Sequence, residues 1–184
     1  MFVICNGMPR SASTWSFRVV VELLERQCVG EAIHKGYSAN LVQFAKAAPC
    51  GTRHMIMKSH PLTPLGRNLL RAGAVKVIYT WRDLADATVS GLETFSRRGA
   101  TFQDFCESFE ESLEVLAFHR AEGMALEVAY ADVMADARSQ VERIARHLWT
   151  QGVPAGVVDE VWSATTMEAS ARLVEEVSRT PDEK

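Results

Sequence analysis

Short apolar runs alternate along this chain with segments of helical pattern, and this alternation restricts its fold more than any other feature. The runs are brief and rich in β-branched residues, as buried strands are: Phe2–Cys5, Met55–Met57, Val75–Trp81 and Leu126–Tyr130. A helix-patterned segment follows most of them. Strands separated by helices predict βαβ units, and therefore an α/β fold with a parallel sheet flanked by helices in a single domain.

The helical segments carry recognisable start signals. Thr14–Gln27 repeats apolar residues at helical spacing, and Asp83 and Thr101 are of the types that cap helix N-termini. The domain is expected over residues 1–177, with a polar tail over 178–184. The other expected helices run from Thr101 to about Arg120, from Asp132 to Trp149, from Pro154 to Val177 as one or two pieces, and around Leu41–Ala47 within the irregular stretch Gly30–Arg53.

Composition limits the classes of partner. A chain of 184 residues can bury one core, and a formal net charge of -3 argues against nucleic-acid binding. No signal-peptide pattern and no span of about 20 apolar residues is found, so we expect a cytoplasmic protein without a membrane partner. The four cysteines show no C-x-x-C pair and no histidine at zinc spacing, which predicts reduced thiols and no metal: Cys5, Cys28, Cys50 and Cys106.

The first candidate site is the turn after the first strand. It leads into a helix, whose unpaired N–H groups and partial positive charge favour a bound phosphate. Arg10 adds a charge, and the small and hydroxyl side chains that follow permit close approach and add donors. A Walker A loop is not matched, because Ala12 and Ser13 stand where that motif has Gly and Lys. An ordinary polar turn with helix caps is the alternative.

The second candidate site begins at the end of the third strand. Ligands of parallel α/β sheets bind at the carboxyl ends of the strands, where Arg82 stands. Ser90 lies about two turns into the next helix, so both side chains can reach one anion. A surface ion pair between Arg82 and Asp86 is the alternative.

The third candidate site is Lys58-Ser59-His60, at the end of the second strand. Two residues apart on a strand, Lys58 and His60 project to the same side. They could supply a cation and a general base near neutral pH. A hydrogen-bonded structural histidine is the alternative. Of the other histidines, we expect His119 and His147 on helix surfaces, and His34 or His54 at most in the lining of an acceptor site.

Taken together, these motifs resemble the PAPS-dependent sulfotransferases of the cytosolic type (PAPS is 3′-phosphoadenosine-5′-phosphosulfate). The family's P-K-S-G-T-T-W corresponds to Pro9–Trp15, its K-T-H to Lys58–His60, and its R-N-P-x-D-x-x-x-S to Arg82–Ser90 with the Arg-to-Ser spacing intact. Its Y-E-D corresponds to Tyr130-Ala131-Asp132, and its T-S-F-E more weakly to Thr165–Glu168. The order is preserved from Phe2 to about Glu168.

The resemblance implies a P-loop nucleotide-kinase-like sulfotransferase core that moves a sulfuryl group from PAPS to a hydroxyl or amine of a small-molecule or carbohydrate acceptor, leaving PAP. It implies His60 as general base, with Lys58 and Arg10 stabilising charge, and no metal, because these cations do its work. The nucleotide would be held by Arg10, Ser11, Ala12, Ser13, Thr14 and Trp15 at the 5′ side, by Arg82 and Ser90 at the 3′-phosphate, and by Tyr130 and Thr165. Trp15 and Tyr130 are candidates for adenine contact, with core packing as the alternative.

The chain also departs from the family pattern. Arg10 replaces the usual Lys, and Ala12 replaces Gly, so the loop must avoid a positive φ there or bear strain. The family's C-terminal R-K-G…G-D-W segment has no counterpart. The missing segment favours the alternative of a non-catalytic PAP- or nucleotide-binding relative. A P-loop nucleotide kinase is the alternative from the same fold class, although the absent Gly-Lys pair and the Arg82…Ser90 site speak against it. The acceptor would be lined by Gly30–Arg53 and Phe95–Phe102, and the oligomeric state is not predicted.

Overall fold

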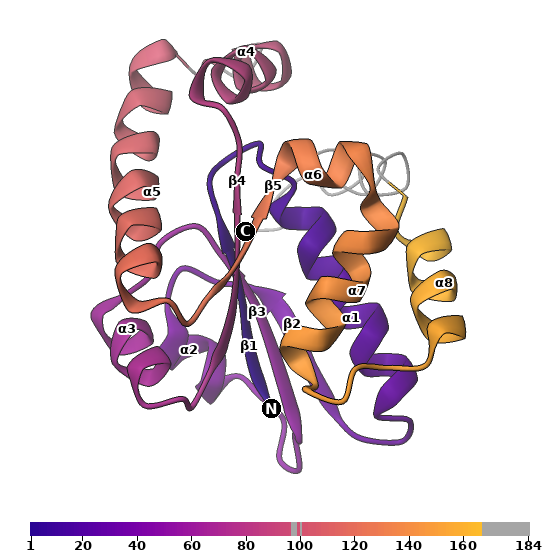
Figure 1. Ribbon diagram of the computed structural model, residues 1–184. Helices are drawn as coiled ribbons and strands as arrows, with labels where there is room; N and C mark the ends of the chain where they lie inside the picture. Colours follow the sequence, from indigo (N-terminus) through magenta and orange to yellow (C-terminus); the bar gives the residue numbers. More distant parts are fainter. Residues whose placement is uncertain (97–98, 100, 167–184) are drawn as a thin grey trace.

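The computed structural model describes residues 1–96, 99 and 101–166. Its centre is a sheet of five parallel strands in the order β2-β3-β1-β4-β5 (Figure 1). The predicted α/β architecture is confirmed. The strands are β1 (Phe2–Gly7), β2 (Ile33–Tyr37), β3 (His54–Ser59), β4 (Lys76–Trp81) and β5 (Leu126–Ala129).

Helices cover both faces of this sheet. Figure 1 shows α1, α7 and α8 on one side, and α2, α3 and α5 on the other, with α4 beyond the end of β4. The helices are α1 (Ser13–Gln27), α2 (Leu41–Lys46), α3 (Pro64–Arg71), α4 (Leu84–Phe95), α5 (Phe102–Glu122), α6 (Tyr130–Ala135), α7 (Ala137–Leu148) and α8 (Ala155–Ala164).

Alternation along the central strand builds a separate core on each face. Val3 and Cys5 of β1 pack with α1, α7 and α8. Ile4, between them, points the other way and packs with α2, α3 and α5. All three side chains are fully buried, as expected of a strand in the middle of a parallel sheet.

The predicted helix caps are present. The Asp83 side chain accepts hydrogen bonds from two N–H groups of the first turn of α4. Thr101 and Asp104 form a capping box at the start of α5. These local signals are reliable because they depend on residues three positions apart.

Two elements were not predicted, and two boundaries differ. The strand β2 reads Ile-His-Lys-Gly-Tyr and lies half-buried at the sheet edge, so it lacks an apolar run. The helix α3 is short, with Thr63 as its cap and Pro64 in its first turn. Tyr130 begins α6 rather than ending β5. The region predicted as one helix from Asp132 is split at Asp136, which leaves helical geometry to cap α7.

The prediction that His119 and His147 lie on helix surfaces is wrong. His119 is 1% exposed and lies between Tyr79 and Phe118, with ring centroids 5.0 and 5.6 Å away. Burial and the charge of Arg67 lower the pKa of His119 to about 4. His147 is partly buried, and burial lowers its pKa as well. Both helices turn these residues toward the sheet, which a sequence position alone does not reveal.

All four cysteines have free thiols, in agreement with the sequence-based expectation. Within the described ranges, none of the helices combines the length and the apolar character needed to cross a bilayer. The second half of the helical segment predicted up to Val177, and the tail at 178–184, lie outside the described residues.

Candidate active site

The three candidate motifs meet at the carboxyl edge of the sheet. From β1 the chain passes through α1 toward β2, whereas from β4 it passes through α4 and α5 toward β5 on the opposite side. The carboxyl ends of the neighbouring strands β1 and β4 are therefore a topological switch point, where open α/β sheets bind their ligands. The turn after Gly7 and the motif beginning at Arg82 both start there.

The turn after β1 holds an unusual backbone. A Cβ at Gly7 would lie 2.1 Å from the Thr80 hydroxyl, so only glycine allows β1 to pass β4 this closely. Arg10 and Ala12 both have positive φ, 62° and 70°. Such a left-handed conformation costs a non-glycine residue about 1–2 kcal/mol. Of the two outcomes expected at Ala12, an avoided positive φ or a strained backbone, the structure has the strained backbone. Backbone strain of this kind is common at functional sites.

The first turn of α1 presents free donors to this loop. Ala12 is its N-cap, and no side chain of the described residues caps it. The N–H groups of Ser13, Thr14 and Trp15 therefore lack the intrahelical partners that later residues have. No acidic residue stands in this first turn, so the positive end of the helix is not neutralised locally. The arrangement suits a phosphate.

Direct contacts join the motifs. The Arg10 Nε donates to the Ser90 Oγ at 3.1 Å, and an Arg82 guanidinium nitrogen lies 3.5 Å from the Arg10 carbonyl oxygen. The Lys58 Nζ donates to the Thr14 Oγ1 at 2.9 Å. The structure therefore brings together residues of three segments far apart in the sequence: Arg10 and Thr14, Lys58, and Arg82 and Ser90.

The cations gathered here have no acidic partner in the described part of the chain. Among the described residues, Arg10, Lys58 and Arg82 form no ion pair with a carboxylate, although other arginines of the chain do. The alternative pairing of Arg82 with Asp86 is not seen. Arg82 instead lies over the Tyr130 ring at 4.0 Å, and its buried Nε has no hydrogen-bond partner within the described ranges. Burial and the neighbouring Arg82 lower the pKa of Arg10. An anion would relieve this repulsion.

His60 is held in one tautomer. Its Nδ1 lies 2.7 Å from the Gly7 carbonyl oxygen, which can only accept a hydrogen bond. Nδ1 therefore carries the proton, and Nε2 keeps its lone pair. Burial lowers the pKa of His60. The hydrogen bond to Gly7 raises this pKa and the charge of Lys58 lowers it, but burial is the largest of the three effects. The ring is therefore neutral near pH 7 and suited to accept a proton.

Several supporting residues were missed by the sequence analysis. The Asn6 Nδ2 donates to the carbonyls of Ser59 and His60, at 3.0 and 2.8 Å, and so ties the end of β3 to β1. The Ser11 hydroxyl lies 2.8 Å from that of Thr80. The one signal available was polarity, because Asn6 and Thr80 are polar residues at the ends of otherwise apolar strands.

Tyr37 is a further residue that only the structure identifies. It ends β2 and is paired in register with Lys58. Its ring lies 6.3 Å from the His60 ring and 5.8 Å from the Lys58 Nζ, and the residue is 63% exposed. An exposed aromatic ring beside a candidate base is suited to contact an incoming substrate.

Other predicted site residues are placed differently. The Trp15 side chain is 1% exposed and packs in the core beneath α1, so it is not available to stack on adenine, and core packing is its role. The Ser11 hydroxyl is occupied by the Met8 and Thr80 carbonyls. Thr165 is buried beyond α8, and its hydroxyl donates to the Val161 carbonyl. The weak T-S-F-E match continues past Thr166 to residues outside the described part of the chain.

His34 and His54 are not at this edge. They lie at the amino-terminal ends of β2 and β3, where the His34 ring contacts the Phe44 ring with the centroids 4.4 Å apart. The suggestion that they line an acceptor site is therefore wrong, since His60 stands at the other end of β3.

Comparison with known proteins agrees with this architecture. The family model described as "Sulfotransferase domain" matches residues 3–173. A retinol dehydratase in complex with retinol and PAP superposes with a TM-score of 0.65 at 17% identity, covering 91% of this chain and 65% of that one. A mouse sulfotransferase with PAP gives 0.65 at 16% identity, with the same coverage. A putative steroid sulphotransferase from Arabidopsis thaliana gives 0.57 at 19% identity, covering 96% and 74%.

These likenesses establish a shared fold. The chain spans 65% of the length of the retinol dehydratase and of the mouse protein. No curated protein sequence matches it significantly.

Proposed function

Because the sulfotransferase domain model matches nearly its whole length, this chain belongs to that family, and we propose that it transfers a sulfuryl group from PAPS to a hydroxyl or amine acceptor. The observation that carries the proposal is the gathering of Arg10, Lys58 and Arg82, without a carboxylate partner among the described residues, around an uncapped helix N-terminus. Such a site suits a doubly anionic nucleotide, and PAPS carries anionic groups at both its 5′ and 3′ positions.

The donor would lie along the carboxyl edge of the sheet. Its 5′-phosphosulfate would accept hydrogen bonds from the N–H groups of Ser13, Thr14 and Trp15 at the start of α1. Its 3′-phosphate would take the hydroxyl of Ser90 and the guanidinium of Arg82, whose Nε has no partner within the described ranges. The 3′-phosphate distinguishes PAPS from ATP and ADP, so this pair would select the donor. Tyr130 beneath Arg82 would orient the guanidinium, and its contact with adenine stays a prediction.

His60 would remove the acceptor's proton. The Gly7 carbonyl holds the proton of the ring on Nδ1, which leaves Nε2 free to act as the base. The acceptor oxygen then attacks the sulfur as the bond from sulfur to the bridging oxygen of the phosphosulfate breaks. Proton transfer to a positioned histidine contributes about 10²–10⁴-fold to such reactions.

Lys58 and Arg10 would stabilise the negative charge that develops on the bridging oxygen and the transferring group. Lys58 already reaches the first turn of α1 through its bond to Thr14. Burial lowers its pKa, which makes the ammonium a readier proton donor than an exposed lysine. Arg10 keeps its charge but cannot give up a proton, so it would act by electrostatics alone.

The acceptor is proposed to be a small molecule that approaches past Tyr37, whose exposed ring lies beside His60. Lining of the acceptor site by Phe102, which is 62% exposed, stays a prediction. Two structures of retinol dehydratase that resemble this chain hold retinol and androsterone, respectively, beside PAP. A carbohydrate acceptor is the other possibility, and the assay below includes both.

The proposal is tested by following sulfate transfer from labelled PAPS to phenols, alcohols, amines and sugars, together with calorimetric titration of PAP, ADP and ATP. Transfer to at least one acceptor, with PAP bound more tightly than ADP, supports the proposal. PAP binding without transfer to any acceptor would instead favour a nucleotide-binding relative. Tighter binding of ATP than of PAP would favour a P-loop nucleotide kinase.

A further inference from the structure

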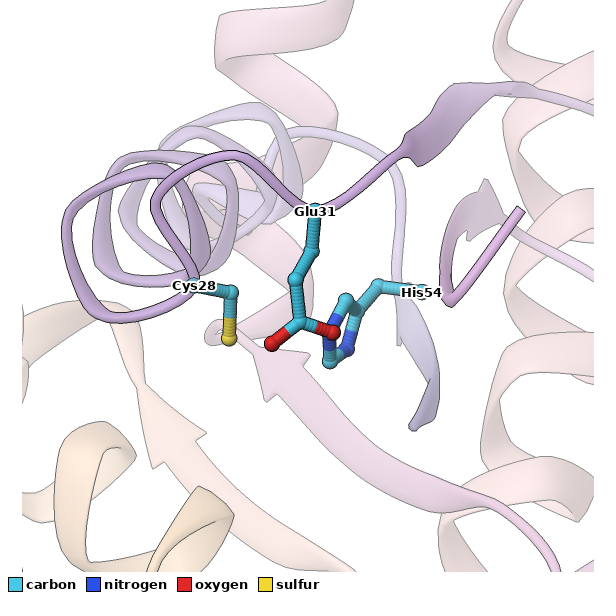
Figure 2. Close-up of side chains that lie close together, drawn as sticks. All are labelled: Cys28, Glu31 and His54. Carbon is cyan, nitrogen blue, oxygen red and sulfur yellow. The ribbon is translucent and has the colours of Figure 1, made fainter. Parts of the chain in front are cut away.

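Three side chains with different metal-ligating atoms meet at the amino-terminal end of the sheet, away from the candidate active site. They are Cys28, Glu31 and His54, drawn in Figure 2. Their ligand atoms all lie within 4.8 Å of one another. The His54 Nε2 is 3.0 Å from a carboxylate oxygen of Glu31, and Figure 2 shows the sulfur of Cys28 on the other side of the same carboxylate.

Backbone hydrogen bonds fix these three residues relative to each other. Cys28 caps the C-terminus of α1, and its N–H donates to the Leu24 carbonyl. The Glu31 N–H donates in turn to the Cys28 carbonyl at 3.0 Å. His54 opens β3, and its N–H lies 3.2 Å from the Ala32 carbonyl. Ligands on hydrogen-bonded backbone lose less freedom when they bind a metal than ligands on a loop without such bonds, which favours binding.

We propose that Cys28, Glu31 and His54 bind one zinc ion, which fastens the end of α1 and the following turn to the start of β3. A thiolate, an imidazole and a carboxylate are all ligands that zinc accepts in tetrahedral sites. One thiolate and one carboxylate also neutralise the charge of a divalent ion. The soft sulfur ligand disfavours magnesium and calcium, which prefer oxygen alone.

The fourth position has room for water. An open surface depression adjoins Glu31, whose side chain is 49% exposed, whereas the side chain of His54 is only 11% exposed. Of the three ligands only Glu31 lines this depression, together with Gly30, Ala32, Gly51 and Arg53. Three protein ligands and one solvent-facing position would complete a tetrahedron.

Binding requires two protons to move. Zinc binds the thiolate, so the Cys28 thiol gives its proton to solvent as its sulfur binds the metal. Zinc at the His54 Nε2 replaces the hydrogen bond to Glu31 and places the ring proton on Nδ1. That atom faces the Met1 ammonium at 3.4 Å, and because both groups would then be donors, the ammonium must turn away or release a proton to solvent.

The metal site and the candidate active site are separate. His54 and His60 stand at opposite ends of β3, and a strand rises about 3.3 Å per residue, so roughly 20 Å lie between them. The site is therefore expected to affect stability without taking part in transfer. Its test does not depend on the proposed sulfotransferase activity.

The experiment uses the full chain after chelation and removal of the chelator. Addition of cobalt(II) as a spectroscopic substitute is expected to give a sulfur-to-cobalt charge-transfer band and the intense visible bands of tetrahedral cobalt, at one equivalent. Zinc should displace the cobalt and raise the Tm. Cys28→Ser and Glu31→Gln should weaken zinc binding by at least about tenfold. A loss of about that size follows even when a residue that only hydrogen-bonds to a metal ligand is replaced.

Cys106→Ser is the matched control, because Cys106 is also a half-buried thiol but lies in α5. It should bind zinc as the unaltered chain does. Glu31→Gln keeps the side-chain shape at an exposed position and so separates lost ligation from lost folding. The proposal fails if zinc leaves the Tm unchanged and no cobalt–sulfur band forms. The contact between Glu31 and His54 would then be a pairing of two side chains without a metal. It also fails if Cys28→Ser binds zinc as tightly as Cys106→Ser.

Discussion

The Nε of Arg10 donates a hydrogen bond of 3.1 Å to the hydroxyl of Ser90, across 80 positions of sequence. Arg10 belongs to the turn after β1, and Ser90 lies in α4, which follows β4. The contact joins a loop expected to hold a 5′-phosphate to a helix expected to hold a 3′-phosphate. The guanidinium of Arg10 therefore lies between the groups proposed to bind the 5′-phosphate and the 3′-phosphate of one nucleotide.

Replacement of Arg82 should remove selectivity for the 3′-phosphate. Arg82→Ala is expected to weaken PAP binding by about tenfold or more, since a charged hydrogen bond contributes roughly 1.5–3 kcal/mol. ADP lacks the 3′-phosphate, so its affinity should change much less. Calorimetric titration of both ligands measures the difference. Arg138→Ala, which removes an arginine paired with Asp159 elsewhere, is the control. Equal losses for PAP and ADP would contradict the assignment.

Replacement of His60 should have the opposite effect. His60→Ala is expected to lower turnover by about 10²–10⁴-fold on a verified acceptor while PAP affinity stays nearly unchanged. Steady-state kinetics and titration on the same preparations check both values. Near-full activity in His60→Ala would show that another group, or the acceptor itself, manages the proton.

The pH profile of transfer follows from the same residues. Only the neutral ring of His60 can accept a proton, and its pKa is lowered below the ordinary 6.5. Activity should therefore be retained as pH falls to 6.5 and be lost only below it. Lys58 acts while protonated, and because its pKa is lowered below 10.5, the alkaline limb should begin below that value. The dependence of kcat/KM on pH measures both limbs, and an acidic limb centred above 6.5 would exclude His60 as the base.

Ala12→Gly should stabilise the protein. The left-handed backbone at Ala12 costs about 1–2 kcal/mol, and glycine removes this cost. The greater freedom of glycine in the unfolded chain offsets about 0.4–1 kcal/mol of the gain. Urea unfolding should therefore show a small net increase in the free energy of unfolding. Ala117→Gly, the same change at an exposed position within α5, should cost about 0.5–1 kcal/mol. A loss in both variants would argue against strain at Ala12.

His119 should make the fold sensitive to mild acid. Its pKa is about 4 in the folded state and near 6.5 when unfolded, so the unfolded chain binds the proton more readily. Stability should fall as pH drops from 6.5 toward 4, by roughly 3 kcal/mol from this group at about 1.4 kcal/mol per pKa unit. His119→Phe should flatten this dependence in urea unfolding between pH 7 and 5. An unchanged slope would show that other groups govern it.

The main elements and the order of the motifs were predictable from the sequence. Apolar runs reveal β1, β3 and β4 because strands inside a parallel sheet are buried on both faces, and β5, although at an edge, still carries the apolar residues Leu126, Val128 and Ala129. The edge strand β2 was not predicted, because a half-buried strand does not need an apolar run and β2 has none. His119 was misplaced for a similar reason: one polar residue on the buried side of a long helix leaves the pattern of the helix almost unchanged.

The sequence by itself determined the family, the α/β class and which charged residues stand at strand ends, since these depend on local pattern and on motif order. Only the tertiary structure decided which other side chains those residues contact. It placed Arg10 against Ser90, turned Trp15 into the core, set Tyr37 beside His60, and brought Cys28 to His54. Contacts between residues so far apart in the sequence depend on strand order and on which face of an element is buried. Both are set by packing over the whole domain, which no local stretch of sequence specifies.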